Sequence, residues 1–324
     1  MIIKKRSLFI FWCLAGITAS AQTPVDSAAT NHTPESYFKF NYDNDFFSAT
    51  DRYYTQGIRL ELSMPMFKYN PFSKVLLKFK NAKNYYGIAI EHDGFTPKSI
   101  RHDTVFVGER PYAATAYLSN FLISTDPVKQ QRLTTQLDLG IIGPNAKGAE
   151  MQKGIHKALN NIQPLGWQYQ VANDVVINYN IEYEKGFLAR KHLEFIGQAG
   201  LRAGTLYDDA NMGAMMRLGW MQPYFENLGM GKHATTHKFQ CYVFLKENVR
   251  AVQYNATMQG GVFEKNSVYT IRVSDIQRVV GTGEVGIVIA YKRVSIEYTK
   301  FYISPEFYGG LPHGWGHCVI AVCF

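Results

Sequence analysis

Between positions 58 and 64 the chain reads Ile58-Arg59-Leu60-Glu61-Leu62-Ser63-Met64, with an apolar side chain at every second residue. Successive side chains of a β-strand point to opposite faces, so this spacing predicts a strand with one apolar and one polar face. The same period returns along the whole chain, at 38–43, 133–139, 177–183, 294–298 and 318–324. The helical period of about 3.6 residues fits none of these segments.

Composition and connection lengths favour a membrane barrel over a soluble β-sandwich. The chain has 324 residues, 46% of them hydrophobic and 19% charged, and its mean hydropathy is -0.18. That average suits a barrel whose strands alternate apolar and polar residues, the polar ones lining a wet lumen. Short connections such as 291–293 alternate with long ones such as 141–174, and the chain ends on Phe324. We therefore predict an all-β fold, a transmembrane antiparallel β-barrel.

The alternating segments number about 12, an even count as in bacterial outer-membrane barrels. We place the strands near 37–45, 53–64, 84–92, 112–123, 131–140, 175–186, 191–206, 211–222, 237–255, 279–291, 293–304 and 315–324. With both ends of the barrel on the periplasmic side, the long connections fall on the outer rim, at 46–52, 93–111, 141–174, 207–210, 256–278 and 305–314. The domain prediction is a single barrel over 37–324.

The start of the chain has the three parts of an export signal. A basic cluster at 4–6 precedes the apolar run from Leu8 to Ile17, and small residues at 19–21 form a cleavage site. We predict a cleaved signal peptide at 1–21 and a short segment at 22–36. Cleavage removes three basic residues and no acid, so the formal net charge falls from +8 to +5. With the barrel, this predicts a place in the bacterial outer membrane.

Oxygen-bearing side chains gather where the first two predicted strands meet. Asn44 and Asp45 end the first strand, and Thr55 lies near the start of the second, close to Gly57. Carboxylate, amide and hydroxyl oxygens without thiols suit a hard cation, Ca²⁺ above all. An ordinary Asx-rich hairpin turn explains the same composition, and the residues alone do not separate the two interpretations.

A short helix is predicted at 148–161, inside the connection that follows Ile141. Gln152 and His156 are four residues apart and therefore share one helical face. A His over the barrel mouth could serve as a general base, and the alternative is a His that only packs or is solvated. Trp167, further along, could anchor at the lipid interface.

A third candidate site is the basic loop at 96–112, which holds Lys98, Arg101 and Arg110. Such residues could pair with phosphates, or they could be a solvated loop. The sequence has no nucleophile elbow of the G-x-S-x-G kind, no Walker loop, no zinc spacing and no nucleic-acid motif.

Six motifs in order resemble one known family, the outer-membrane lipid A 3′-O-deacylases of the LpxR type. They are Asn44-Asp45, Thr50-Asp51-Arg52-Tyr53-Tyr54-Thr55-Gln56-Gly57, Gly108-Glu109-Arg110-Pro111-Tyr112-Ala113, Leu139-Gly140-Ile141-Ile142-Gly143-Pro144, Gln152 with His156, and Gly166-Trp167-Gln168 with Gln170. The motifs cover roughly residues 38 to 185. The resemblance implies a twelve-stranded barrel that removes the 3′-linked acyloxyacyl chains of lipid A in the outer leaflet with Ca²⁺.

Residue by residue, the resemblance implies His156 as the base, Gln152 as a supporting residue and Asn44 as an active-site residue. Asp45 and Thr55 match metal positions, while the family's basic loop has no clean alignment, so Lys98 or Arg101 is its counterpart for substrate binding. One position departs from the family, because Ile162 stands where its best-known members carry a carboxylate, six residues after the His.

Two rival functions remain at the level of sequence. A non-enzymatic barrel, a small porin or an adhesin, would need neither His156 nor Asp45. A phospholipase-type barrel would act on glycerophospholipids instead of lipid A. The sequence names no protein partner.

Overall fold

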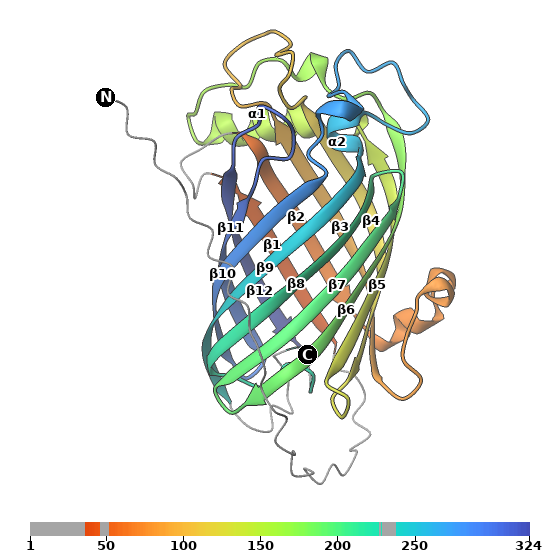
Figure 1. Ribbon diagram of the computed structural model, residues 1–324, viewed down its shortest axis with the longest axis vertical. Helices are drawn as coiled ribbons and strands as arrows, with labels where there is room; N and C mark the ends of the chain where they lie inside the picture. Colours follow the sequence, from red (N-terminus) through yellow and green to blue (C-terminus); the bar gives the residue numbers. More distant parts are fainter. Residues whose placement is uncertain (1–35, 46–51, 227, 229–237) are drawn as a thin grey trace. The chain divides into compact units, whose positions relative to one another are not determined.

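A computed structural model describes residues 36–45, 52–226, 228 and 238–324. These residues form 12 β-strands that close into one antiparallel barrel, with β1 paired to both β2 and β12 (Figure 1). The predicted fold class and strand number are therefore confirmed. The predicted signal peptide at 1–21 and most of the segment at 22–36 lie outside the described residues. None of the described helices has the length and apolar character needed to cross a membrane.

The strands follow the predicted order, with ends shifted by a few residues. They are β1 Tyr37–Asn44, β2 Tyr53–Ser63, β3 Lys83–Thr96, β4 Ala113–Asp126, β5 Gln131–Ile142, β6 Asp174–Arg190, β7 Leu193–Gly204, β8 Tyr207–Trp220, β9 Phe239–Asn255, β10 Val279–Tyr291, β11 Val294–Ile303 and β12 His313–Cys323. The α-helices are α1 Gly148–Ala158 and α2 Ala256–Gln259. The 3-10 helices are η2 Pro65–Tyr69, η3 Pro71–Val75, η4 Pro144–Ala146, η5 Trp167–Tyr169 and η6 Val273–Asp275.

The alternation of side chains gives the wall an apolar outer face and a polar inner face. On β2, Leu60 points outward and is 40% exposed, whereas its neighbour Glu61 is buried in the lumen and accepts a hydrogen bond from the Tyr37 hydroxyl at 2.6 Å. Ile90, on the outer face of β3 beside Leu60, is 61% exposed. An apolar outer face of this kind is what a lipid-facing wall requires.

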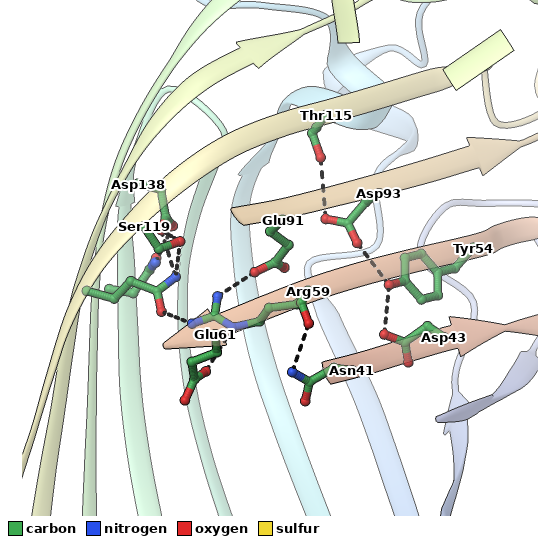
Figure 2. A network of polar contacts seen from close by, with 12 residues as sticks. Asn41, Asp43, Tyr54, Arg59, Glu61, Glu91, Asp93, Thr115, Ser119 and Asp138 are labelled. Carbon is green, nitrogen blue, oxygen red and sulfur yellow. Dashed lines mark hydrogen bonds and ion pairs between the residues drawn. The ribbon is translucent and has the colours of Figure 1, made fainter. Parts of the chain in front are cut away.

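Inside the barrel, paired charges and hydrogen bonds cross from strand to strand (Figure 2). The Arg59 guanidinium bonds to Glu91 at 2.5 Å and to Glu61 at 3.1 Å. The Tyr54 hydroxyl lies between the carboxylates of Asp43 and Asp93, at 3.2 and 2.9 Å. Arg59, Glu61 and Glu91, which lie partly or fully buried in the lumen, each have a partner of opposite charge, as charges removed from water require.

The two ends of the barrel differ. We call the end that carries α1 the loop rim, and the end where Tyr37 pairs with Cys323 the terminal rim (Figure 1). Two connections at the terminal rim, 64–82 and 221–238, are long, so the predicted alternation of short and long connections is wrong there. The predicted connection at 207–210 is also wrong, since these residues belong to β8 and only 205–206 turn the chain.

The described residues 221–226 place Tyr224 in the lumen near the terminal rim. The Tyr224 hydroxyl donates to Glu184 at 2.6 Å, and the Tyr224 carbonyl accepts from Arg132 at 2.6 Å. Glu184 and Arg132 face the lumen, so Tyr224 is held inside the barrel. A cavity of about 220 Å³ remains beside it, lined by charged side chains that include Lys39, Glu182 and Arg217.

Candidate functional site

The connection between β5 and β6 folds back against the outside of the barrel. Helix α1 begins at Gly148, directly over Ala114, whose neighbours Ala113 and Thr115 are also fully buried. A Cβ at Gly148 would lie 2.4 Å from the Ala114 Cβ, so glycine is what allows the helix to approach the wall this closely. Around this contact is a buried apolar cluster of Ile100, Tyr112, Ala114, Ala146 and Trp167.

The face of α1 that is buried against the wall is polar. Gln152 is 1% exposed and His156 is 7% exposed, whereas Leu159, directly after the helix, is 67% exposed. The Trp167 indole nitrogen donates to the Gln152 side-chain oxygen at 2.8 Å. Trp167 is therefore buried between the helix and the wall, and its predicted role as an exposed lipid anchor is wrong.

A backbone carbonyl orients the His156 ring. Its Nδ1 lies within short hydrogen-bond distance of the Ile162 carbonyl oxygen. A carbonyl only accepts, so Nδ1 carries the proton and Nε2 is left as the basic nitrogen. The backbone carbonyl of Ile162 thus orients the imidazole, at the position where the resemblance described above led us to expect a carboxylate.

The three oxygen-bearing residues lie on the same rim as α1. Cross-strand pairing places Asn44 beside Gln56, Gln56 beside Gly94, and Gly94 beside Ala114, on which α1 begins. Neighbouring strands are about 4.8 Å apart, so this row joins the end of β1 to the base of the helix across three strand spacings.

Asp45 and Thr55 are both buried, at 3% and 4% exposure. The Asp45 carboxylate accepts a hydrogen bond from the Arg52 backbone N–H at 2.8 Å, which fixes it at the rim. Thr55 lies at a register shift between Tyr54 and Gln56, where β2 bulges against β3. Bulges commonly re-aim side chains near functional sites.

The donor set fits a hard cation in its chemistry. Asp45 supplies a carboxylate, Asn44 an amide oxygen and Thr55 a hydroxyl, the oxygen ligands that Ca²⁺ prefers. Within the described residues, no three His, Cys, Asp or Glu side chains gather into a metal cluster. Ca²⁺ takes 6–8 oxygen ligands, so an ion at this place would take further donors besides these three, such as backbone carbonyls, water or substrate.

Two residues of this rim were not among the predicted site residues. Gln56 is 2% exposed, and its side-chain nitrogen has no hydrogen-bond partner among the described residues. Lys300 pairs with Gly316, which pairs with Asn44, and its ammonium interacts electrostatically with Asp45. Gln56 could have been noticed in the sequence, since it lies inside the motif at 50–57. Lys300 could not, because only the strand pairing through β12 brings it next to Asn44.

The predicted basic loop is not gathered into this site. Lys98 is exposed and lies 3.7 Å from the Glu109 carboxylate, and Arg101 is exposed as well. Arg110 is instead buried, where it bonds to Glu306 and to the Thr257 hydroxyl, both at 2.6 Å. Arg110 therefore ties three connections together at the loop rim.

Comparisons with known proteins agree with this architecture. The solved structure of LpxR from Salmonella typhimurium matches with a TM-score of 0.71 and 20% identity, covering 89% of this chain and all of that one. The β domain of the Bordetella autotransporter BrkA matches at a TM-score of only 0.43 and 10% identity, over 90% of this chain and 100% of that one. No curated protein sequence matches.

The family comparison covers nearly the whole sequence. The family described as outer membrane protein LpxR matches residues 8–324. This span includes all 12 strands and helix α1. The chain therefore belongs to the LpxR family of outer membrane proteins.

Proposed function

We propose that this protein is a lipid A 3′-O-deacylase that hydrolyses the ester of the 3′-linked acyloxyacyl chain in the extracellular leaflet. Membership of the LpxR family supports the reaction class. The observation that carries the site assignment is the buried polar face of α1, with His156 oriented by the Ile162 carbonyl against the outer wall. A site outside the barrel suits a lipid substrate, which stays in the bilayer because its acyl chains are costly to expose to water.

In the proposed reaction, His156 Nε2 takes a proton from a water molecule as the water oxygen attacks the ester carbonyl. The C–O bond to the sugar then breaks, and the proton passes from His156 to the leaving sugar oxygen. The products are the free acyloxyacyl acid and a 3′-hydroxyl on lipid A. Gln152 holds the helix in place through its bond to Trp167.

A calcium ion bound at Asp45, Thr55 and Asn44 would polarise the ester carbonyl and stabilise negative charge on its oxygen. The protein's own residues prepare this position. The backbone of Arg52 fixes the Asp45 carboxylate, and Thr55 lies at the bulge of β2 close by. Lys300 adds a positive charge beside Asp45, which suits a phosphate-bearing substrate such as lipid A.

The structure gives less support to a porin than to an enzyme. A porin needs an open lumen, whereas here Tyr224 enters one end and paired charges around Arg59 cross the interior. A phospholipase-type barrel remains the competing enzyme, since it would use an ester site at the same lipid interface.

Purified protein in detergent micelles should separate the two enzymatic proposals. With Ca²⁺ present, we expect it to release the acyloxyacyl acid from lipid A and to release no fatty acid from phosphatidylethanolamine. Mass spectrometry of both lipids measures the products. Fatty-acid release from phosphatidylethanolamine with intact lipid A would contradict the proposal.

A further inference from the structure

The long connection at 64–82 forms an external flap, the name used below for these residues. In Figure 1 it is the orange segment that stands outside the barrel beside β5 and β6, near the terminal rim. Its two 3-10 helices, η2 and η3, meet at Asn70, whose side chain caps η3 by accepting the Phe72 N–H. Outer-membrane barrels usually have short turns at the periplasmic end, which is the terminal rim in the predicted orientation. A structured flap at that rim is therefore unusual and suggests a specific function.

Polar contacts hold the flap against the outer face of the wall. The Asn70 amide donates to Asn120 at 2.6 Å, and the Thr135 hydroxyl donates to the Leu77 carbonyl at 3.2 Å. The Ser124 hydroxyl accepts the Phe79 N–H at 3.0 Å. From β6, the Tyr179 hydroxyl donates to the Val75 carbonyl.

The wall beneath the flap is built to be covered. Asn120, Ser124 and Thr135 point outward, since the lumen-facing residues Ser119 and Gln136 alternate with them, yet all three are 0–2% exposed. A polar side chain left facing acyl chains without a partner would cost several kcal/mol. The flap supplies those partners, and it is therefore a docked part of the fold.

The outer surface of the flap combines apolar side chains with positive charge. Between 64 and 82 the sequence has four lysines and no Asp or Glu. Exposed large apolar side chains lie among them, namely Met66 at 61%, Tyr69 at 77%, Phe72 at 44%, Val75 at 55% and Leu77 at 50%. The Lys68 ammonium lies 4.7 Å from the centre of the Tyr69 ring.

The position of the flap along the wall matches the edge of a bilayer. Its contact residue Asn120 is six residues from Asp126, where β4 ends at the terminal rim. With a rise of about 3.3 Å per residue and a tilt of about 40°, the flap covers roughly the last 15 Å of the wall. A headgroup layer and the adjoining acyl carbons lie within that distance of a barrel's end.

We propose that the external flap is an interfacial anchor that binds the headgroup phosphates of the phospholipid leaflet at the terminal rim. Its aromatic and aliphatic side chains enter the boundary between headgroups and acyl chains, where amphipathic rings are favoured. Its lysines extend their ammonium groups to the phosphates, and no carboxylate of the segment opposes them. The flap is thus selective for anionic lipid, on the face of the membrane opposite α1.

Fluorescence quenching by brominated lipids tests this proposal. Tyr69→Trp places an indole at the most exposed ring of the flap, and the parent protein provides the background from its own tryptophans. The protein is reconstituted in phosphatidylcholine vesicles that contain increasing fractions of brominated phosphatidylcholine or brominated phosphatidylglycerol. We expect both lipids to quench the new indole, with phosphatidylglycerol preferred several-fold.

The lysines should account for that preference. The double variant Lys68→Gln/Lys74→Gln, made in the Tyr69→Trp protein, should remove most of the preference, so that the two brominated lipids quench the indole about equally. The matched control, Lys153→Gln/Lys157→Gln on the exposed side of α1, should leave the preference unchanged. Heat-modifiable gel mobility confirms that each variant folds.

Two results would overturn the proposal. An indole that neither brominated lipid quenches would place the flap in water, as a surface for a soluble partner. Equal quenching by the two lipids, unchanged in the lysine variant, would leave an apolar contact without headgroup recognition.

Discussion

At the scale of single residues, the site depends on how one imidazole is held. The Ile162 carbonyl, not its side chain, contacts His156 Nδ1. The side chain of Ile162 is 44% exposed, so Ile162→Ala keeps the hydrogen bond and removes little packing. We expect lipid A turnover to stay within roughly threefold of the parent, as is usual for exposed positions. A loss of two orders of magnitude, measured by product formation in micelles, would show that the side chain itself is required.

The metal proposal belongs to the same scale. Because the rim offers oxygens and no thiolate, chelation with EDTA should abolish deacylation, Ca²⁺ should restore it, and Zn²⁺ should not. Asp45→Ala should lower turnover strongly even in excess Ca²⁺, since the carboxylate is the only charged ligand of the three. Full activity of Asp45→Ala in EDTA would contradict the proposal that deacylation requires Ca²⁺ bound at Asp45.

Sequence spacing could locate only part of this site. Gln152 and His156 are one helical turn apart, so their spacing in the sequence predicts that they share one face of the helix. Lys300 and Gln56 reach the rim through strand register, and register between distant segments is set by the closed sheet. Lys98 and Arg101 are basic residues of the right loop, but their side chains are exposed and stay outside the cluster.

At the scale of elements, α1 buries its polar face, whereas an amphipathic helix of a soluble protein buries its apolar face. Its polar side, with Gln152 and His156, is buried against the wall, whereas Leu159 directly after the helix is exposed. In a membrane protein such an exposed apolar side chain has a partner in lipid. The sequence predicted the helix and the shared face of Gln152 and His156, but it did not predict that this face would be buried.

The docking of α1 can be tested at its first residue. Gly148→Leu puts a Cβ into Ala114 and Trp167, so the helix must lift from the wall. Since displacement by about 1 Å can cost on the order of 10²-fold in rate, turnover should fall by a similar factor while the barrel still folds. Gly154→Leu is the matched control, because a Cβ at Gly154 meets nothing within 4 Å. Equal turnover in the two variants would contradict a catalytic role for the docked helix.

The strands were predictable because each exposes one face to lipid and one to the lumen. The exception at 207–210 has a physical cause. Asp208 and Asp209 are typical turn residues, but Asp209 is held in the lumen by the Arg202 guanidinium and Asp208 accepts the Gly204 N–H at 2.8 Å. The external flap was missed as well, because a loop that packs on the outside of a barrel has no period of its own.

At the scale of the whole molecule, strand parity fixes which connections share a rim. Gly309 lies in the connection between β11 and β12 at the loop rim, and Lys292 lies in the tight turn between β10 and β11 at the terminal rim. An epitope tag inserted at Gly309 should be accessible to antibody on intact cells, and one inserted at Lys292 should become accessible only after permeabilisation. Surface labelling at Lys292 would reverse the orientation and place α1 in the periplasm.

The most direct test of the central claim is the mass spectrum of lipid A from a Gram-negative host that makes this protein. With the parent chain, we expect the 3′ acyloxyacyl group to be lost. His156→Asn lacks the base, so the loss should slow by roughly two orders of magnitude or more, while heat-modifiable mobility shows a folded barrel. A folded His156→Asn protein that still removes this group at the parent rate would contradict the account.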